Sequence, residues 1–325
     1  MKIWQQNVIL TAALLAFGAA RMPFEATLAR ELREENLTPP PLKIGTLDQI
    51  GQTSSAVALG GLRTLVATFL NLRAFSFFQE KRWDKVAATF DTIVNLAPRT
   101  RYYWETGSWH QSYNAASSYL NDSELPALRR REYWRNSIIA GRTFLERGIL
   151  NKPDDWSMHA SLGFLLSDPN KFPAFDDPNQ TFLAAANAYH EASMANNAMP
   201  FVRRAELYSL ARVVGKEAEA LSLARVLYAD KTNRSPRVKM LLFVLEAHEN
   251  PNLDLTKRSI ELFGTAKEAY QNLSILWQRT EDRFPVYGVA SVLVSLEKSL
   301  NVPEKESVLK KPAKSPTGPD EWFAK

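Results

Sequence analysis

The residue types best suited to recognising a partner gather in an aromatic stretch at residues 101–119. Tyrosine and tryptophan combine a large apolar ring with a polar group, and both are favoured at interfaces. Charged and amide side chains are interleaved with these rings. We therefore expect partner contacts here, although core packing is the commoner role of such rings. The candidate contact residues are Arg101, Trp104, Glu105, Gln111 and Asn114.

Motifs for catalysis or metal binding are absent from the sequence. The histidines are spread over different expected helix pairs, and none belongs to an HExxH zinc motif. No GxSxG nucleophile motif occurs. The absence of cysteine excludes thiol nucleophiles, disulfides and cysteine-bound zinc. We expect a non-enzymatic protein with no cofactor and no metal. The histidines considered were His110, His159, His190 and His248.

Length and charge limit the possible classes of protein. A chain of 325 residues can bury a large core, as one long solenoid or as two domains. The net charge of +5 is modest for this length and is not the concentrated basic face of a nucleic-acid-binding protein. We expect no nucleic-acid partner.

The elements that must position the aromatic stretch begin with two helices, expected at residues 62–79 and 83–98. Val86, Phe90 and Ile93 recur at steps of four and three, which places them on one helical face. Pro98 stops the second helix, and residues 80–82 form a short polar connection. The sequence therefore predicts an antiparallel pair. Because the first helix is apolar nearly all round, we expect it to be buried.

The same rhythm of small and apolar residues, closed by a proline, returns before Pro153 and again before Pro200. Small residues at Ser108 and Gly163 predict close approach of paired helices. This pattern resembles a degenerate tetratricopeptide repeat. The resemblance implies an all-α fold of antiparallel helix-hairpin repeats, a TPR-like α-solenoid, over residues 46–301. The alternative is a non-repetitive helical bundle. In repeat arrays the first helices line the concave surface, where partners bind.

The chain ends carry different patterns. Residues 1–24 contain an apolar run after Lys2 and predict a signal anchor or a cleaved signal peptide. Residues 25–45 predict a charged helix and a proline-rich spacer, and residues 302–325 predict a disordered tail rich in proline and lysine.

A looser resemblance, to bacterial membrane-anchored helical-repeat proteins, rests on PPPL at residues 39–42, GGLR at residues 60–63 and the aromatic segment at residues 104–114. It implies an inner-membrane anchor with the repeat domain in the periplasm. The alternative location is secretion after signal cleavage.

These features favour a non-enzymatic, membrane-tethered scaffold that binds a protein or peptide partner through the concave face of its repeats. One alternative is a structural subunit of an envelope complex, which requires a large apolar patch. Another is a glycan-binding or glycan-processing helical toroid centred on Trp104, Glu105 and Trp109. A deep aromatic cleft with a buried carboxylate would favour the toroid, whereas a shallow polar groove would favour the scaffold.

Overall fold

A computed structural model describes residues 62–279 and 283–310, and every regular element in these ranges is a helix. The expected all-α class is therefore confirmed. The chain divides into two compact units, and the second begins at Trp104. The predicted anchor, charged helix and spacer (residues 1–45) and the end of the tail (residues 311–325) lie outside the described ranges. Within those ranges, no helix is both long and apolar enough to span a bilayer.

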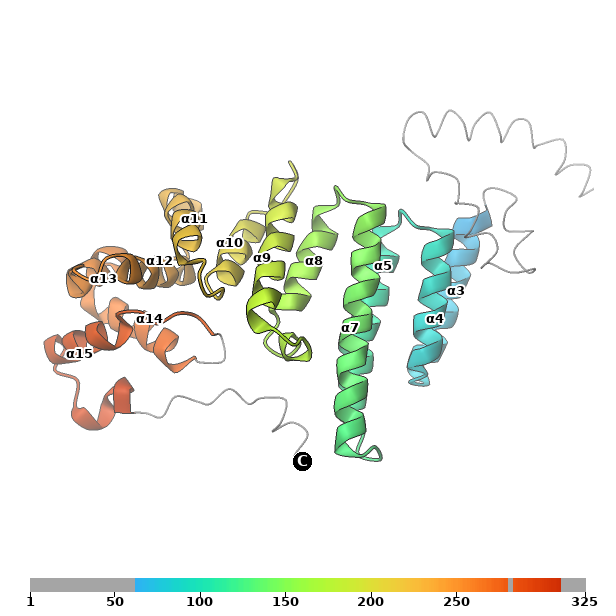
Figure 1. Cartoon of the computed structure of the whole chain (residues 1–325), viewed down its shortest axis with the longest axis horizontal. Helices are drawn as coiled ribbons and strands as arrows, with labels where there is room; N and C mark the ends of the chain where they lie inside the picture. Colours follow the sequence, from blue (N-terminus) through green and yellow to red (C-terminus); the bar gives the residue numbers. More distant parts are fainter. Residues whose placement is uncertain (1–61, 280–282, 311–325) are drawn as a thin grey trace, which may run out of the picture. The chain divides into compact units, whose positions relative to one another are not determined.

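The first unit contains the predicted pair of helices, α3 (Leu62–Gln79) and α4 (Trp83–Leu96), which pack against each other (Figure 1). The connection turns at Lys81, whose positive φ reverses the chain. Val86, Phe90 and Ile93 are buried, as their spacing predicted. The pattern of apolar residues and turn residues thus gave both helices correctly.

The expected burial of α3 is wrong. Four of its apolar side chains are more than half exposed, and Phe69 is 62% exposed. Among the α3 side chains that the structure describes, those of Ala67 and Ala74 are buried. The reason is geometric: α3 packs mainly against α4, and a single neighbouring helix can cover only one side of it. The exposed side chains are Leu65, Phe69, Leu72 and Phe75.

The second unit begins within α5 (Arg101–Trp109). This helix continues as a π-helical segment at His110–Ala115, which is followed by α6 (Ala116–Leu120). The long α7 (Ala127–Asn151) follows, and then α8 (Trp156–Ser167), α9 (Pro178–Met194) and α10 (Phe201–Leu210). α7 contacts α8, α8 contacts α9, and α9 contacts α10 (Figure 1). The side chains of Asp155 and Asp177 accept backbone N–H bonds at the starts of α8 and α9, which fixes where these helices begin.

The rest of the second unit contains α11 (Glu217–Ala229), α12 (Pro236–Glu249), α13 (Leu255–Phe263), α14 (Ala266–Gln278) and α15 (Val289–Ser299). A hydrophobic core joins these helices. α12 lies at its centre, because five consecutive side chains, from Leu241 to Leu245, are buried.

The folded part of the chain extends beyond the expected boundary at residue 301. Two short 3-10 turns follow α15, at Glu304–Glu306 and Val308–Lys310. Val308 is buried in the core, while the Ser307 hydroxyl and the Val308 N–H both donate to the carboxylate of Glu297. One apolar side chain and these hydrogen bonds hold residues that composition alone placed in the tail.

Small residues allow close contacts between helices in the second unit. The Ser108 hydroxyl donates to the Gly141 carbonyl at 2.8 Å. A Cβ added at Gly163 would lie 2.8 Å from two ring carbons of Tyr189, which is closer than packed atoms approach. The close approach predicted at Ser108 and Gly163 is therefore confirmed, and it brings α5 towards α7 and α8 towards α9.

Candidate functional site

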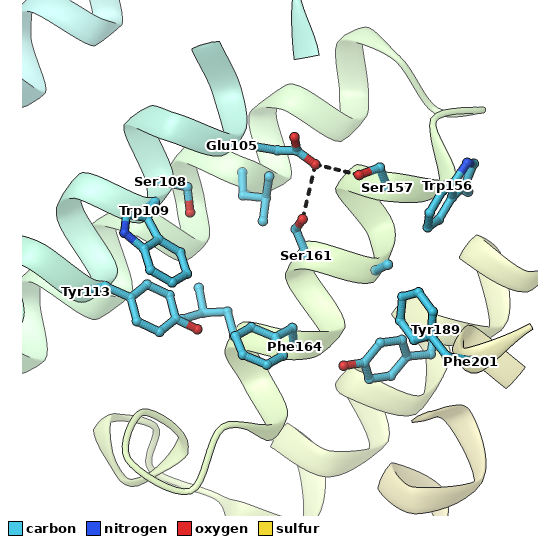
Figure 2. A pocket seen from close by; sticks show the side chains of 13 residues that line it. Glu105, Ser108, Trp109, Tyr113, Trp156, Ser157, Ser161, Phe164, Tyr189 and Phe201 are labelled. Atoms are coloured by element: carbon cyan, nitrogen blue, oxygen red, sulfur yellow. Dashed lines mark hydrogen bonds between the residues drawn. The ribbon is translucent and has the colours of Figure 1, made fainter. Parts of the chain in front are cut away.

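The second unit contains a cavity of about 300 Å³ with aromatic walls, which we call the aromatic pocket (Figure 2). Its walls come from α5 and the π-helical segment, α7, α8, α9 and α10. This volume lies at the lower end of the range for ligand pockets and suits one or two side chains or a single sugar ring. The lining residues are Glu105, Ser108, Trp109, Tyr113, Leu145, Trp156, Ser157, Ala160, Ser161, Phe164, Leu165, Tyr189 and Phe201.

One wall is built where α5 changes into the π-helical segment. Trp109, the last residue of α5, stacks on Tyr113 with ring centroids 4.0 Å apart and an interplanar angle of 14°. The Trp109 side chain is 50% exposed, so one large ring remains open to a ligand. π-Helical turns are rare and often occur at functional sites, where they change which side chains share a face.

The opposite wall is built by α8, whose residues repeat at steps of four. Trp156, Ala160 and Phe164 all line the aromatic pocket, and Ser157 and Ser161 lie beside them on the same helix. Residues four apart share a helical face, which explains why one helix supplies both an aromatic and a hydroxyl row. Phe164 is 52% exposed although it is an apolar ring.

The serine row fixes a carboxylate inside the aromatic pocket. The Ser157 hydroxyl donates to Glu105 Oε1 at 2.7 Å, and the Ser161 hydroxyl donates to the same oxygen at 3.2 Å. Figure 2 shows both bonds reaching from α8 to Glu105. Two donors on one helix thus hold the Glu105 side chain in one orientation.

Tyr189 and Phe201 complete the aromatic pocket. Tyr189, on α9, is buried and lies against Gly163 of α8. Phe201, the first residue of α10, is half-exposed and meets Trp156 edge to face, with centroids 6.5 Å apart. Three half-exposed rings, those of Trp109, Phe164 and Phe201, thus surround one cavity.

The tyrosines of the aromatic pocket are neutral at physiological pH. Burial, together with the nearby Asp168 carboxylate, raises the pKa of the Tyr113 phenol, and burial raises the pKa of Tyr189. Burial also lowers the pKa of Lys171, whose Nζ lies 5.0 Å from the centre of the Tyr113 ring. Among the described residues that line the aromatic pocket, Glu105 is the one with a carboxyl group.

Trp104 does not have the exposure that a contact residue needs, which corrects its expected role. Its side chain is 2% exposed and packs against Phe144, with ring centroids 5.0 Å apart. A Cβ added at Gly148 would lie 2.8 Å from Trp104 Cγ, so the ring fills the space that this glycine leaves. Trp104 is therefore a core residue, the alternative role considered for these rings.

Of the five expected contact residues, Glu105 alone lines the aromatic pocket. Arg101 is exposed on α5 outside the lining. Gln111 donates to a backbone carbonyl of its own helix at 3.3 Å. The Asn114 amide nitrogen lies 2.9 Å from Nδ1 of His110, one turn earlier. The amides of Gln111 and Asn114 thus make bonds within their own helical segment.

The residues that sequence reasoning missed are those of the second wall. The signal was present in residues 156–164, where Trp156 and Phe164 are eight positions apart and two serines are four apart, so that each pair shares a helical face. What the sequence did not contain was the pairing of α8 with α5, whose side chains are about fifty residues apart.

Other possible sites are weaker. In the described part of the chain, no group of three or more histidine, aspartate or glutamate side chains is placed to hold a metal ion. A second cavity, of about 470 Å³, lies among α10, α12 and α14. Its lining includes Arg279 and Phe284, which stand on either side of the undescribed residues 280–282.

Comparison with known proteins does not identify a family: no protein-family model, no curated protein sequence and no solved structure matches this chain.

Proposed function

We propose that this chain is a non-enzymatic scaffold of tetratricopeptide-like helical repeats whose aromatic pocket receives a side chain from a segment of a partner protein. The apolar run at residues 1–24 tethers it to the bacterial inner membrane, with the helical body in the periplasm. The observation that carries the binding function is the ring of half-exposed aromatic side chains around one cavity.

Exposed aromatic rings support binding because they are costly to leave in water. Trp109, Phe164 and Phe201 each keep about half of their surface accessible, although they border a cavity that could have closed around them. Rings of this type, gathered around a concave site, supply most of the binding energy at protein interfaces.

The chemistry of the lining supports binding over hydrolysis. Glu105 is the one carboxylate among the lining residues of the described chain, and both serine hydroxyls beside it donate to it. Acid–base hydrolysis of a glycosidic bond generally uses two carboxyl groups. A serine whose hydroxyl donates to a carboxylate, without a histidine base in the lining, also lacks the arrangement of an activated nucleophile.

The test is selection of linear peptides from a random phage-displayed library on the full-length chain. Peptides that bind are then measured against Trp109→Ala and against the control Tyr102→Ala. Both rings lie on α5 and have similar exposure, 50% and 56%, but only Trp109 lines the aromatic pocket. We expect Trp109→Ala to weaken binding about tenfold or more and Tyr102→Ala to leave it unchanged. Equal effects, or no enriched peptide, would remove the proposal.

The second candidate function is glycan binding at the same aromatic pocket. The observation that favours it is the half-exposed Trp109 ring close to the Glu105 carboxylate, since sugar rings stack on tryptophan and donate hydroxyl hydrogen bonds to carboxylates. Screening the chain against soluble oligosaccharides tests this candidate. Binding that depends on Trp109, without any enriched peptide, would favour it over the scaffold.

The third candidate, a structural subunit of an envelope complex, is favoured by the exposed apolar side chains of α3. Its test is the size of the complex extracted from membranes with a mild detergent. A subunit that docks through α3 would separate from its complex in Phe69→Glu, while Trp109→Ala would leave the complex intact.

A further inference from the structure

We propose that the partner segment is anchored in the aromatic pocket by a phenylalanine side chain, whose ring packs against those of Trp109, Phe164 and Phe201. This inference rests on the proposed peptide-binding function and specifies the class of side chain that the aromatic pocket receives, an uncharged aromatic ring.

The serine hydroxyls of the lining are already used within the chain. Ser108 donates to the carbonyl of Gly141 at 2.8 Å, and Ser157 and Ser161 donate to Glu105. A hydroxyl has one proton to donate, so these three donors are taken. A carboxylate or carbonyl group that entered the aromatic pocket would lose its hydration without gaining hydrogen bonds from them. The serines therefore do not select a ligand that accepts hydrogen bonds.

The rest of the lining is apolar. Six of the thirteen described lining residues carry aromatic rings, and Leu145, Ala160 and Leu165 are aliphatic. The described lining contains neither lysine nor arginine, so an acidic side chain would find no opposite charge in it. An apolar side chain that fills the cavity removes its own surface and that of the half-exposed rings from water. The lining thus favours an apolar anchor.

A row of three rings favours an aromatic anchor over an aliphatic one. Trp109 stacks on Tyr113, and Tyr113 lies nearly parallel to Phe164, with ring centroids 6.3 Å apart and an interplanar angle of 20° (Figure 2). The outer two rings, those of Trp109 and Phe164, are half-exposed. Contacts between aromatic rings contribute to binding beyond the area that they bury, and an aliphatic side chain does not make them.

A second group of rings makes the cavity the size of one side chain. Trp156 and Phe201 meet edge to face, and the half-exposed Phe201 ring comes from α10 rather than from α5 or α8. The cavity that these rings help to line has a volume of about 300 Å³. This volume admits one aromatic side chain and excludes a folded element.

The experiment uses the peptides selected on the full-length chain. We expect phenylalanine at one fixed position of the enriched sequences. Replacing this phenylalanine by alanine should weaken binding about thirtyfold or more, measured by fluorescence anisotropy. Replacing it by cyclohexylalanine, which keeps a six-membered ring but has no aromatic face, should weaken binding about threefold to tenfold. The protein is unchanged in both comparisons, so folding cannot account for the differences.

A protein variant locates the effect. Phe164→Leu keeps an apolar side chain on α8 but removes one ring from the lining, so the ratio between the affinities of the phenylalanine and cyclohexylalanine peptides should fall by about twofold or more. The control Phe69→Leu makes the same change at an exposed phenylalanine of α3 outside the lining and should keep the full ratio. An unchanged ratio in Phe164→Leu would overturn the placement of the anchor against α8.

The remaining outcomes separate the two proposals. Enriched peptides with a charged residue at the fixed position, or without any fixed aromatic residue, overturn the aromatic anchor but leave peptide binding in place. A cyclohexylalanine peptide that binds as tightly as its phenylalanine parent overturns the assignment to an aromatic ring, because apolar burial alone would then suffice. If no peptide binds at all, the proposed function itself fails.

Discussion

Two tryptophans on the same helix provide a direct test of how the second unit is built. Trp104 and Trp109 are five positions apart on α5, and the same substitution, to alanine, removes the same atoms from each. Trp104 is 2% exposed and Trp109 is 50% exposed. We expect Trp104→Ala to unfold the second unit at much lower denaturant, and Trp109→Ala to affect mainly ligand binding.

The magnitudes follow from the surroundings of each ring. Replacing a buried tryptophan by alanine costs about 3–5 kcal/mol, and the cost is higher where neighbours cannot move into the cavity. Gly148, directly beneath the Trp104 ring, has no side chain with which to fill it. Trp109→Ala removes a side chain of which about half the surface is buried, together with its stacking contact with Tyr113. We expect this substitution to cost about 1–2 kcal/mol of stability.

The assay is urea unfolding of the full-length variants, followed by far-UV circular dichroism. The free energy of unfolding falls linearly with urea, so the shift in midpoint measures the loss of stability. A Trp104→Ala variant that is as stable as Trp109→Ala would refute the assignment of Trp104 to the core. It would also restore Trp104 as a candidate contact residue.

Three further predictions concern packing, ionisation and an ion pair, each measured by urea unfolding. Gly163→Ala should lower the urea midpoint and weaken peptide binding, because the new Cβ meets the Tyr189 ring at 2.8 Å. Overpacking costs about 1–3 kcal/mol, whereas the gain in helix propensity is about 1 kcal/mol. An unchanged midpoint would mean that α8 and α9 are not in close contact. The raised pKa of Tyr113 keeps its phenol protonated in the folded state, whereas the phenol of the unfolded state ionises above pH 10.0, so the stability of the protein falls as the pH rises above that value. This ionisation lowers the free energy of unfolding by about 1.4 kcal/mol per pH unit, and Tyr113→Phe should abolish this part of the pH dependence. Identical pH profiles for both proteins would contradict the burial of the phenol. Arg258→Ala should cost about 1–3 kcal/mol, because it leaves the largely buried Glu246 carboxylate without its two-bonded partner, whereas a neutral effect would show that solvent already screens this pair.

The parts of the fold that the sequence predicted correctly are those that depend on residues close together in the chain. The helices at α3 and α4 were predicted because apolar spacing and turn residues act over a few positions. The exposure of Phe69 was not predicted, because the number of neighbours around a helix depends on distant parts of the chain. Val308 shows the same limit at the other end, where one buried side chain holds a segment of tail-like composition.

The sequence predicted only part of the site, because the site also depends on contacts between distant parts of the chain. Glu105 was predicted because it is one of the polar residues within the aromatic stretch at residues 101–119. The sequence did not separate the buried Trp104 from the exposed Trp109, because the burial of Trp104 depends on Phe144 and Gly148 of α7, which lie far along the chain. The hydrogen bonds from α8 to Glu105 join residues far apart in the sequence and have no local signature.

The most direct measurement places a bound peptide on the chain. A selected peptide carrying the photoreactive residue benzoylphenylalanine beside its anchoring position is irradiated with the full-length protein, and the crosslinked residues are identified by mass spectrometry. We expect adducts at the rim of the aromatic pocket, on Trp109, Phe164 or Phe201, and their loss when the unlabelled peptide competes. Adducts confined to other surfaces, such as α3, would contradict the central claim that the aromatic pocket is the binding site.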